Sequence, residues 1–169
     1  MSEWAEFGGV IGRYRNESTP WWPDPVRPPA GAPNVLVVLL DDVGFAQLGC
    51  FGSDIATPTF DRLAANGLRY TNFHTTALCA PTRAALLSGR NHHTVGMGVV
   101  TELATSAPGY SSVRPNTCAP LALTLRQNGY STAQFGKCHE VPVWQTSPMG
   151  PFDAWPTGVW LGAATLCLL

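Results

Sequence analysis

Val35-Leu36-Val37-Val38-Leu39-Leu40 runs directly into Asp41-Asp42, and this stretch decides the fold. The apolar run is unbroken and rich in β-branched residues, which is typical of a strand buried on both faces of a sheet. Two adjacent carboxylates then end the run. We therefore predict a buried strand over residues 35–40 with a polar tip.

Helix and strand signals alternate after this first strand. Pro at a first helical position and Gly just past a last one mark helix ends. They predict helices over Thr59–Asn66, from about Pro81 to Gly89, and over Leu121–Asn128. Strands are expected over Leu68–Phe73 and Tyr130–Phe135, and residues 91–117 should be loop. This alternation predicts an α/β fold whose parallel-type sheet is covered by helices on both faces.

The bulk composition narrows the class of function. The chain has 169 residues, of which 45% are hydrophobic and 12% charged, so it has enough apolar surface to collapse into a core. Its net charge of -1 favours neither nucleic acid nor an anionic membrane as a partner. An anionic substrate must then be attracted by local groups.

Cysteine usage and the termini predict the compartment. The five cysteines are scattered and form no C-x-x-C pair, which fits a reducing environment. Residues 1–10 carry Glu3 and Glu6 and lack the basic and apolar regions of a signal peptide. The apolar tail over 159–169 is shorter than the roughly 20 residues that span a bilayer. We expect a cytoplasmic protein.

The chain divides into three parts by composition. Residues 1–33 contain six of the prolines together with Trp4, Trp21 and Trp22, which predicts an extended arm that packs against another surface. Residues 34–158 carry the helix and strand signals. Residues 159–169 are an apolar tail.

Polar side chains follow each predicted strand. Asp41-Asp42 comes after the first, His74 and Cys79 after the second, and Lys137 with His139 after the third. In open α/β sheets, ligands bind outside the carboxyl ends of the strands. We therefore expect these groups to meet in one site.

Each group has a chemical and a structural interpretation. The repulsion between Asp41 and Asp42 is relieved by a hard cation between them, although turn or capping aspartates also fit. Cys79 at the start of a helix, with Arg83 one turn further, experiences a positive potential that favours a thiolate and an oxyanion, although a buried structural cysteine is the alternative. Lys137 suits an anion and His139 suits proton transfer; a surface lysine and a strand-end histidine would look the same.

The motifs that carry these groups resemble those of the sulfatase family. Cys79-Ala80-Pro81-Thr82-Arg83, followed by a helix that closes with Ser88-Gly89-Arg90, is similar to the family signature C-x-P-x-R. Val35–Gly44 resembles the first strand with its Asp-Asp-x-Gly, and Gly136-Lys137-Cys138-His139 resembles the second signature. The resemblance runs from about Gly12 to Gly158. It implies an incomplete alkaline-phosphatase-like sulfatase fold, with 34–158 as the N-terminal part of the catalytic domain.

The resemblance also implies a mechanism. Cys79 would be oxidised to formylglycine by a separate formylglycine-generating enzyme, and its hydrate would attack the sulfur of a small-molecule sulfate ester. Ca2+, or else Mg2+, would be held by Asp41, Asp42 and the modified Cys79. Arg83 would hold the hydrate, Lys137 would bind a sulfate oxygen, and His139 would contact a hydroxyl of formylglycine.

The sequence departs from the family pattern in two ways. Cys138 replaces an aromatic residue, and Glu140-Val141-Pro142 differs from the small residues usual there. An Asp-Asn pair and a further His and Lys of the family are absent, which predicts a truncated or frame-disrupted product with little or no turnover. The alternatives are a phosphonate or phosphate monoester hydrolase of the same superfamily and a non-catalytic remnant.

Overall fold

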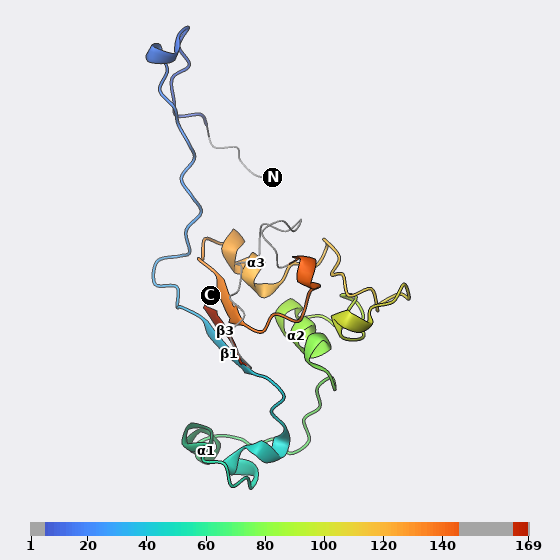
Figure 1. Cartoon of the computed structure of the whole chain (residues 1–169). Helices are drawn as coiled ribbons and strands as arrows, with labels where there is room; N and C mark the ends of the chain where they lie inside the picture. The colour runs from blue at the N-terminus through green and yellow to red at the C-terminus, as the bar shows by residue number, and fades with distance from the viewer. Residues whose placement is uncertain (1–5, 146–163, 169) are drawn as a thin grey trace.

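The computed structural model describes residues 6–145 and 164–168, coloured along the chain in Figure 1. Its helices are α1 (Pro58–Ala65), α2 (Cys79–Ser88) and α3 (Leu121–Gln127), and its strands are β1 (Leu36–Leu40), β2 (Ala133–Gly136) and β3 (Ala164–Leu168). Short 3-10 turns lie at η1 (Arg15–Glu17), η2 (Phe45–Gln47), η3 (Gly49–Phe51), η4 (Thr101–Leu103) and η5 (Val143–Gln145). In this part of the chain no helix is long and apolar enough to cross a membrane.

The sheet differs from the parallel pairing expected from the sequence. Its strand order is β1-β3-β2, and both neighbour pairs are antiparallel, with Leu36 and Ala133 each opposite Leu168. β1 and β2 therefore point in the same direction, but β3 lies between them. β3 lies within residues 159–169, which the sequence analysis assigned to the apolar tail. It occupies the position between β1 and β2, where a parallel sheet would have β1 and β2 side by side.

β1 is not buried on both faces. Leu36, Val38 and Leu40 are 57%, 58% and 43% exposed, whereas Val37 and Leu39 are partly buried. The three described helices leave that face uncovered: α1 packs on η3, away from the sheet, as Figure 1 shows. The prediction of helices on both faces is thus wrong for the described residues, because no described helix packs on the face of β1 that carries Leu36, Val38 and Leu40.

The three predicted helices are confirmed, and their ends follow the expected local chemistry. Pro58 opens α1, and α2 closes at Gly89, which has φ +64° and donates its N–H to Ala85 O at 2.9 Å. Gly129, with φ +88°, follows α3. Positive φ is the left-handed region that glycine adopts at the least cost, so these glycines end the helices.

The strand predicted over 68–73 is absent. Leu68, Tyr70 and Phe73 are 84%, 66% and 76% exposed, and the segment has no ladder partner. The strand predicted over 130–135 forms as β2, which begins three residues later and ends one residue later. An apolar segment becomes a strand only where a neighbour completes its backbone hydrogen bonds, and residues 68–73 lack one.

The core lies between α2 and the irregular segment that follows it. Ala80 and Ala84 of α2 pack against Val95, Met97 and Cys118, all of them at most 6% exposed. Small alanines on this face of α2 let the segment approach closely. The core therefore fixes α2, and with it the residues of the helix that face the strand tips.

The described part of the N-terminal arm is extended and projects from the rest of the molecule (Figure 1). Val10 and Thr19 pair through two backbone hydrogen bonds of 3.0 and 2.9 Å. Trp21 packs edge-on against Phe7 within the arm, but Trp22 is 84% exposed. Trp4 lies outside the described residues. The arm was expected to pack against another surface, but the aromatic partner of Trp21 is a residue of the arm itself.

Candidate active site

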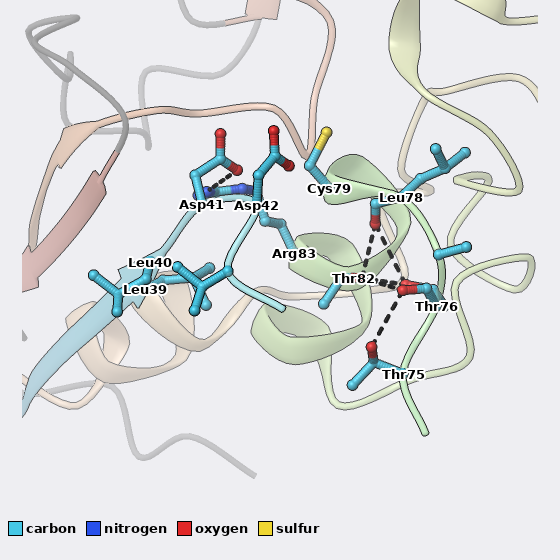
Figure 2. Close-up of a pocket in the computed structure, with 12 residues that line it drawn as sticks. Leu39, Leu40, Asp41, Asp42, Thr75, Thr76, Leu78, Cys79, Thr82 and Arg83 are labelled. Carbon is cyan, nitrogen blue, oxygen red and sulfur yellow. Dashed lines mark hydrogen bonds and ion pairs between the residues drawn. The ribbon is translucent and has the colours of Figure 1, made fainter. Parts of the chain in front are cut away.

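Three segments that are far apart in the sequence bring their polar groups together. Asp41 follows β1, Cys79 and Arg83 lie on the first turns of α2, and Lys137 and His139 follow β2. In Figure 2 the carboxylates of Asp41 and Asp42 and the thiol of Cys79 project to the same side. A pocket of about 210 Å³ lies here, lined by residues 39–43, 75–79, 82 and 83.

Arg83 joins the three segments. Its guanidinium is 3% exposed; Nη2 donates to Asp41 Oδ1 at 3.0 Å, and Nη1 donates to the backbone oxygen of Lys137 at 3.0 Å. α2 thereby ties the tip of β1 to the end of β2. Because a buried guanidinium is strongly destabilising without its acceptors, this pairing fixes the geometry of the site.

Asp41 and Lys137 form the second ion pair. Lys137 Nζ lies 2.7 Å from Asp41 Oδ2, so each oxygen of Asp41 faces a different cation. Burial alone would raise the pKa of Asp41, but the bonds from Lys137 and Arg83 outweigh it, and the pKa lies below its ordinary value. Burial likewise opposes the charge of Lys137, but Asp41 and the nearby Cys79 raise its pKa above the ordinary value. Both groups are therefore charged at neutral pH.

Cys79, His139 and Glu102 stand in a row. Cys79 Sγ lies 3.0 Å from His139 Nδ1, and His139 Nε2 lies 2.9 Å from both carboxylate oxygens of Glu102. His139 is 18% exposed and Glu102 is 64% exposed, so the row runs from the pocket to the surface. Such an arrangement presents a base to a nucleophile and an acceptor to the base.

The two departures from the family pattern form a buried polar cluster. Glu140 is 1% exposed; it accepts from the backbone N–H of His139 at 2.9 Å and from Gln134 Nε2 at 3.3 Å. The Cys138 thiol donates to it at 3.4 Å. Burial first, and the charge of Glu140 next, raise the pKa of Cys138 well above its ordinary value. Cys138 is thus a protonated thiol at neutral pH that helps to hold the segment carrying Lys137 and His139.

The described residues do not complete a metal site. Asp42 is exposed and adopts a left-handed backbone with φ +53°, which turns its carboxylate beside that of Asp41. However, both oxygens of Asp41 already face Arg83 and Lys137, and no group of three or more His, Cys, Asp or Glu in the described part of the chain could hold a metal ion. Calcium takes about 6–8 oxygen ligands, so these two carboxylates supply only a fraction of a site.

Most of the residues singled out from the sequence lie in this one place, and two observations differ from expectation. His74 is exposed and bonded to Asn72 Oδ1 at 2.7 Å, outside the pocket. Glu102 was missed, because a single acid in a segment rich in Gly, Ser and Pro carries no local signal. Cys50, Cys79, Cys118 and Cys138 are free thiols.

Comparison with known proteins identifies the class to which this site belongs. The sequence profile of the sulfatase family matches residues 33–164, which is most of the chain. The chain therefore belongs to the sulfatase family, whose members generally use calcium and a formylglycine made from cysteine, and whose fold is of the alkaline-phosphatase-like α/β type. The described structure is an incomplete version of that fold.

Individual relatives agree with the family and show how much of it is present. The chain is 41% identical over 114 residues to an uncharacterized sulfatase of Schizosaccharomyces pombe, covering 63% of this chain and 21% of the relative. It is 39% identical over 112 residues to human arylsulfatase A, covering 65% and 21%. It is 31% identical over 109 residues to an arylsulfatase of Klebsiella aerogenes, covering 63% and 24%. The chain thus spans about one fifth of the length of these relatives.

Proposed function

We propose that this chain provides the nucleophile-bearing part of a sulfuric ester hydrolase, with Cys79 as the precursor of the nucleophile. One observation carries the proposal: the thiol of Cys79 lies at the N-terminus of α2, 3.0 Å from His139 Nδ1, beside the ion pair of Asp41 and Lys137. No side chain caps this helix, because its N-cap residue is Leu78. Free backbone N–H groups at a helix start attract oxyanions.

The proposed reaction uses a modified Cys79. A formylglycine-generating enzyme would oxidise the side chain to an aldehyde, which hydrates to a gem-diol. One hydroxyl attacks the sulfur of the ester and the alcohol leaves; the second hydroxyl then loses its proton, sulfate departs, and the aldehyde is restored. A plain thiol has no second hydroxyl, so it could not release sulfate in this way.

The neighbours of Cys79 have distinct proposed roles in that reaction. Lys137 would bind a sulfate oxygen with its ammonium, which Asp41 holds in place. His139 would take or return a proton at Nδ1, the atom that faces the Cys79 side chain. Arg83 is committed to Asp41 and to the backbone of Lys137, so we assign it to holding the site rather than to direct contact with sulfate.

Asp41 and Asp42 are proposed as part of a divalent metal site, together with modified Cys79. Carboxylate oxygens favour Ca2+, with Mg2+ as the alternative, and the ion would polarise a bound oxygen. Lys137 now supplies the positive charge at Asp41 Oδ2. A cation bound there would have to share that carboxylate with Lys137, so metal affinity should be low in this chain.

The proposed partners follow from the same chemistry. They are a small-molecule sulfate ester and the formylglycine-generating enzyme, encountered in the cytoplasm, with no role for nucleic acid or a membrane. In a full-length sulfatase we propose that β1 and β2 belong to a mostly parallel sheet covered on both faces, including the exposed face of β1.

The test compares two esters. A full-length sulfatase carrying residues 33–164 of this chain should hydrolyse nitrophenyl sulfate faster than nitrophenyl phosphate, and Cys79→Ala should abolish the reaction. The 169-residue chain alone should show little or no turnover. Preference for the phosphate ester would assign the site to a phosphate or phosphonate monoester hydrolase instead. Robust turnover by the 169-residue chain would contradict the incomplete metal site.

A further inference from the structure

Glu102 contacts the imidazole of His139, and neither the family motifs nor the proposed reaction uses it. It comes from η4, in a segment that shares no sequence motif with the strand tips. Both of its carboxylate oxygens lie 2.9 Å from His139 Nε2, opposite the nitrogen that faces Cys79. The placement of Glu102 therefore bears on how the imidazole is oriented.

The hydrogen-bonding capacity of the three groups fixes which nitrogen carries the proton. The hydrogen bond with His139 is the main cause that lowers the pKa of Glu102. Glu102 is therefore an ionised carboxylate at neutral pH, and its oxygens can only accept hydrogen bonds. Nε2 must therefore donate. In a neutral ring Nδ1 then has a lone pair, which accepts the S–H of Cys79 at 3.0 Å.

We propose that Glu102 is a positioning residue, which holds the His139 ring with the Nδ1 lone pair directed at the side chain of residue 79. The inference deepens the proposed function, because a formylglycine hydrate at residue 79 would meet the same nitrogen. In the unmodified chain, this orientation of His139 has a consequence that can be measured without any sulfatase activity. The Cys79 thiol has a proton acceptor, His139 Nδ1, already within hydrogen-bonding distance.

Alkylation measures this consequence. When Cys79 Sγ attacks the methylene carbon of iodoacetamide, an S–C bond forms, the C–I bond breaks and iodide leaves. The thiol proton passes to His139 Nδ1, and Glu102 stabilises the resulting imidazolium through Nε2–H. Removal of Glu102 frees the ring to turn, so the reaction should slow even though Cys79 itself is unchanged.

The experiment uses the 169-residue chain with limiting iodoacetamide and mass mapping of each cysteine peptide. Glu102→Ala should slow alkylation of Cys79 by up to roughly fivefold, the size expected from the loss of one solvent-exposed ion-pair hydrogen bond. Glu102→Gln, which keeps an oxygen acceptor, should restore part of the rate. Glu17→Gln, at an exposed carboxylate in the arm, is the matched control and should leave it unchanged.

Internal comparison separates positioning from a loss of structure. The rates at Cys50 and buried Cys118 should be the same in all variants, because neither touches His139. A parallel NMR readout is the His139 Nε2–H proton, whose exchange with water is slowed while Glu102 accepts its hydrogen bond. It should be visible in the wild type and lost to exchange in Glu102→Ala.

Two results would overturn the inference: an unchanged Cys79 rate in Glu102→Ala, or equal slowing at Cys50 and Cys118. Neither depends on conversion of Cys79 to formylglycine or on ester hydrolysis. A positive result, together with no ester hydrolysis by the full-length sulfatase that carries residues 33–164, would retain Glu102 as a positioning residue and reject the proposed function. The opposite pattern would retain the function and reject the role of Glu102.

Discussion

The segment that follows α2 and the segment that precedes it differ in composition, and their apolar side chains lie in opposite environments. Residues 91–118 are rich in Gly, Ser and Pro, yet Val95, Met97 and Cys118 are buried against α2. Half of residues 68–73 are apolar, yet Leu68 and Phe73 are 84% and 76% exposed. Burial here depends on the partner surface that α2 supplies, and not on the local density of apolar residues.

The irregular segment also satisfies its own backbone. Met97 N–H donates to His92 O at 2.7 Å, and Ser112 N–H donates to Gly96 O at 2.8 Å. A segment without helix or strand can be buried when turns of this kind pair its polar groups. It carries Glu102, so the same packing that builds the core also delivers a carboxylate to the site.

The largest expected effect comes from breaking the link between α2 and the strand tips. Arg83→Met should lower the free energy of unfolding by about 3–5 kcal/mol, because Asp41 and the Lys137 carbonyl lose a buried partner. Urea unfolding followed by circular dichroism measures it. Arg90→Met, at an exposed arginine just beyond the same helix, is the matched control. Equal losses in the two variants would show that Arg83 does not link the segments.

Truncation on each side of α2 should sharpen the contrast between the two segments. Met97→Ala removes a fully buried side chain and should lower the free energy of unfolding by about 2–5 kcal/mol. Phe73→Ala removes a larger but exposed side chain and should change it by roughly 0.5 kcal/mol or less. Urea midpoints of both variants give the comparison. A larger loss for Phe73→Ala would mean that residues 68–73 are buried in solution.

The Asp41 carboxylate predicts the pH dependence of stability. Its pKa is lower in the folded chain than in the unfolded chain, where it is near 3.9, so the unfolded state binds the proton more readily. The stabilisation is therefore complete above about pH 5 and is lost as the pH falls through the folded pKa. Urea midpoints between roughly pH 7 and 3, in chelator-containing buffer, measure it.

A pair of carboxylate variants identifies the group responsible for that loss of stability at low pH. Asp41→Asn should be less stable at neutral pH and should lose less on acidification than the wild type. Asp24→Asn, at an exposed carboxylate in the arm, should retain the wild-type profile. If Asp41→Asn lost as much stability on acidification as the wild type, the titrating group would lie elsewhere.

The smallest expected effect is at the end of α2. Gly89→Ala should cost about 1–2 kcal/mol, because φ is +64° and no atom lies within 4 Å of the added Cβ, which leaves backbone strain as the cause. Gly44→Ala, at φ -92° with only Gln47 Oε1 at 3.6 Å, should be nearly neutral. Thermal unfolding resolves the difference, and equal midpoints would rule out strain at Gly89.

Local chemistry allowed the helices and the motif residues to be predicted from the sequence. Pro58, Gly89 and Gly129 act on their own neighbours, so their effects can be read without knowing the fold. The convergence of Asp41, Cys79 and Lys137 followed from the rule that strand tips meet at one edge of a sheet. The structure places Asp41 beside Lys137 and Cys79 beside His139, although the strand expected before Cys79 does not form.

The pairing of strands and the role of Glu102 could not be predicted, because both depend on contacts between distant segments. β3 pairs with β1 and β2 across more than 25 intervening residues, and its apolar sequence fits a tail equally well. Glu102 reaches His139 only because residues 91–118 pack on α2. Nothing near either residue in the sequence specifies that contact.

The most direct test of the account is the chemical state of Cys79. The 169-residue chain would be produced together with a formylglycine-generating enzyme, and the tryptic peptide Tyr70–Arg83 would be weighed by mass spectrometry. The account predicts a peptide lighter by the difference between a thiol and an aldehyde, while Cys50, Cys118 and Cys138 remain thiols. A Cys79 that stays a plain thiol, under conditions in which a control sulfatase is converted, would contradict it.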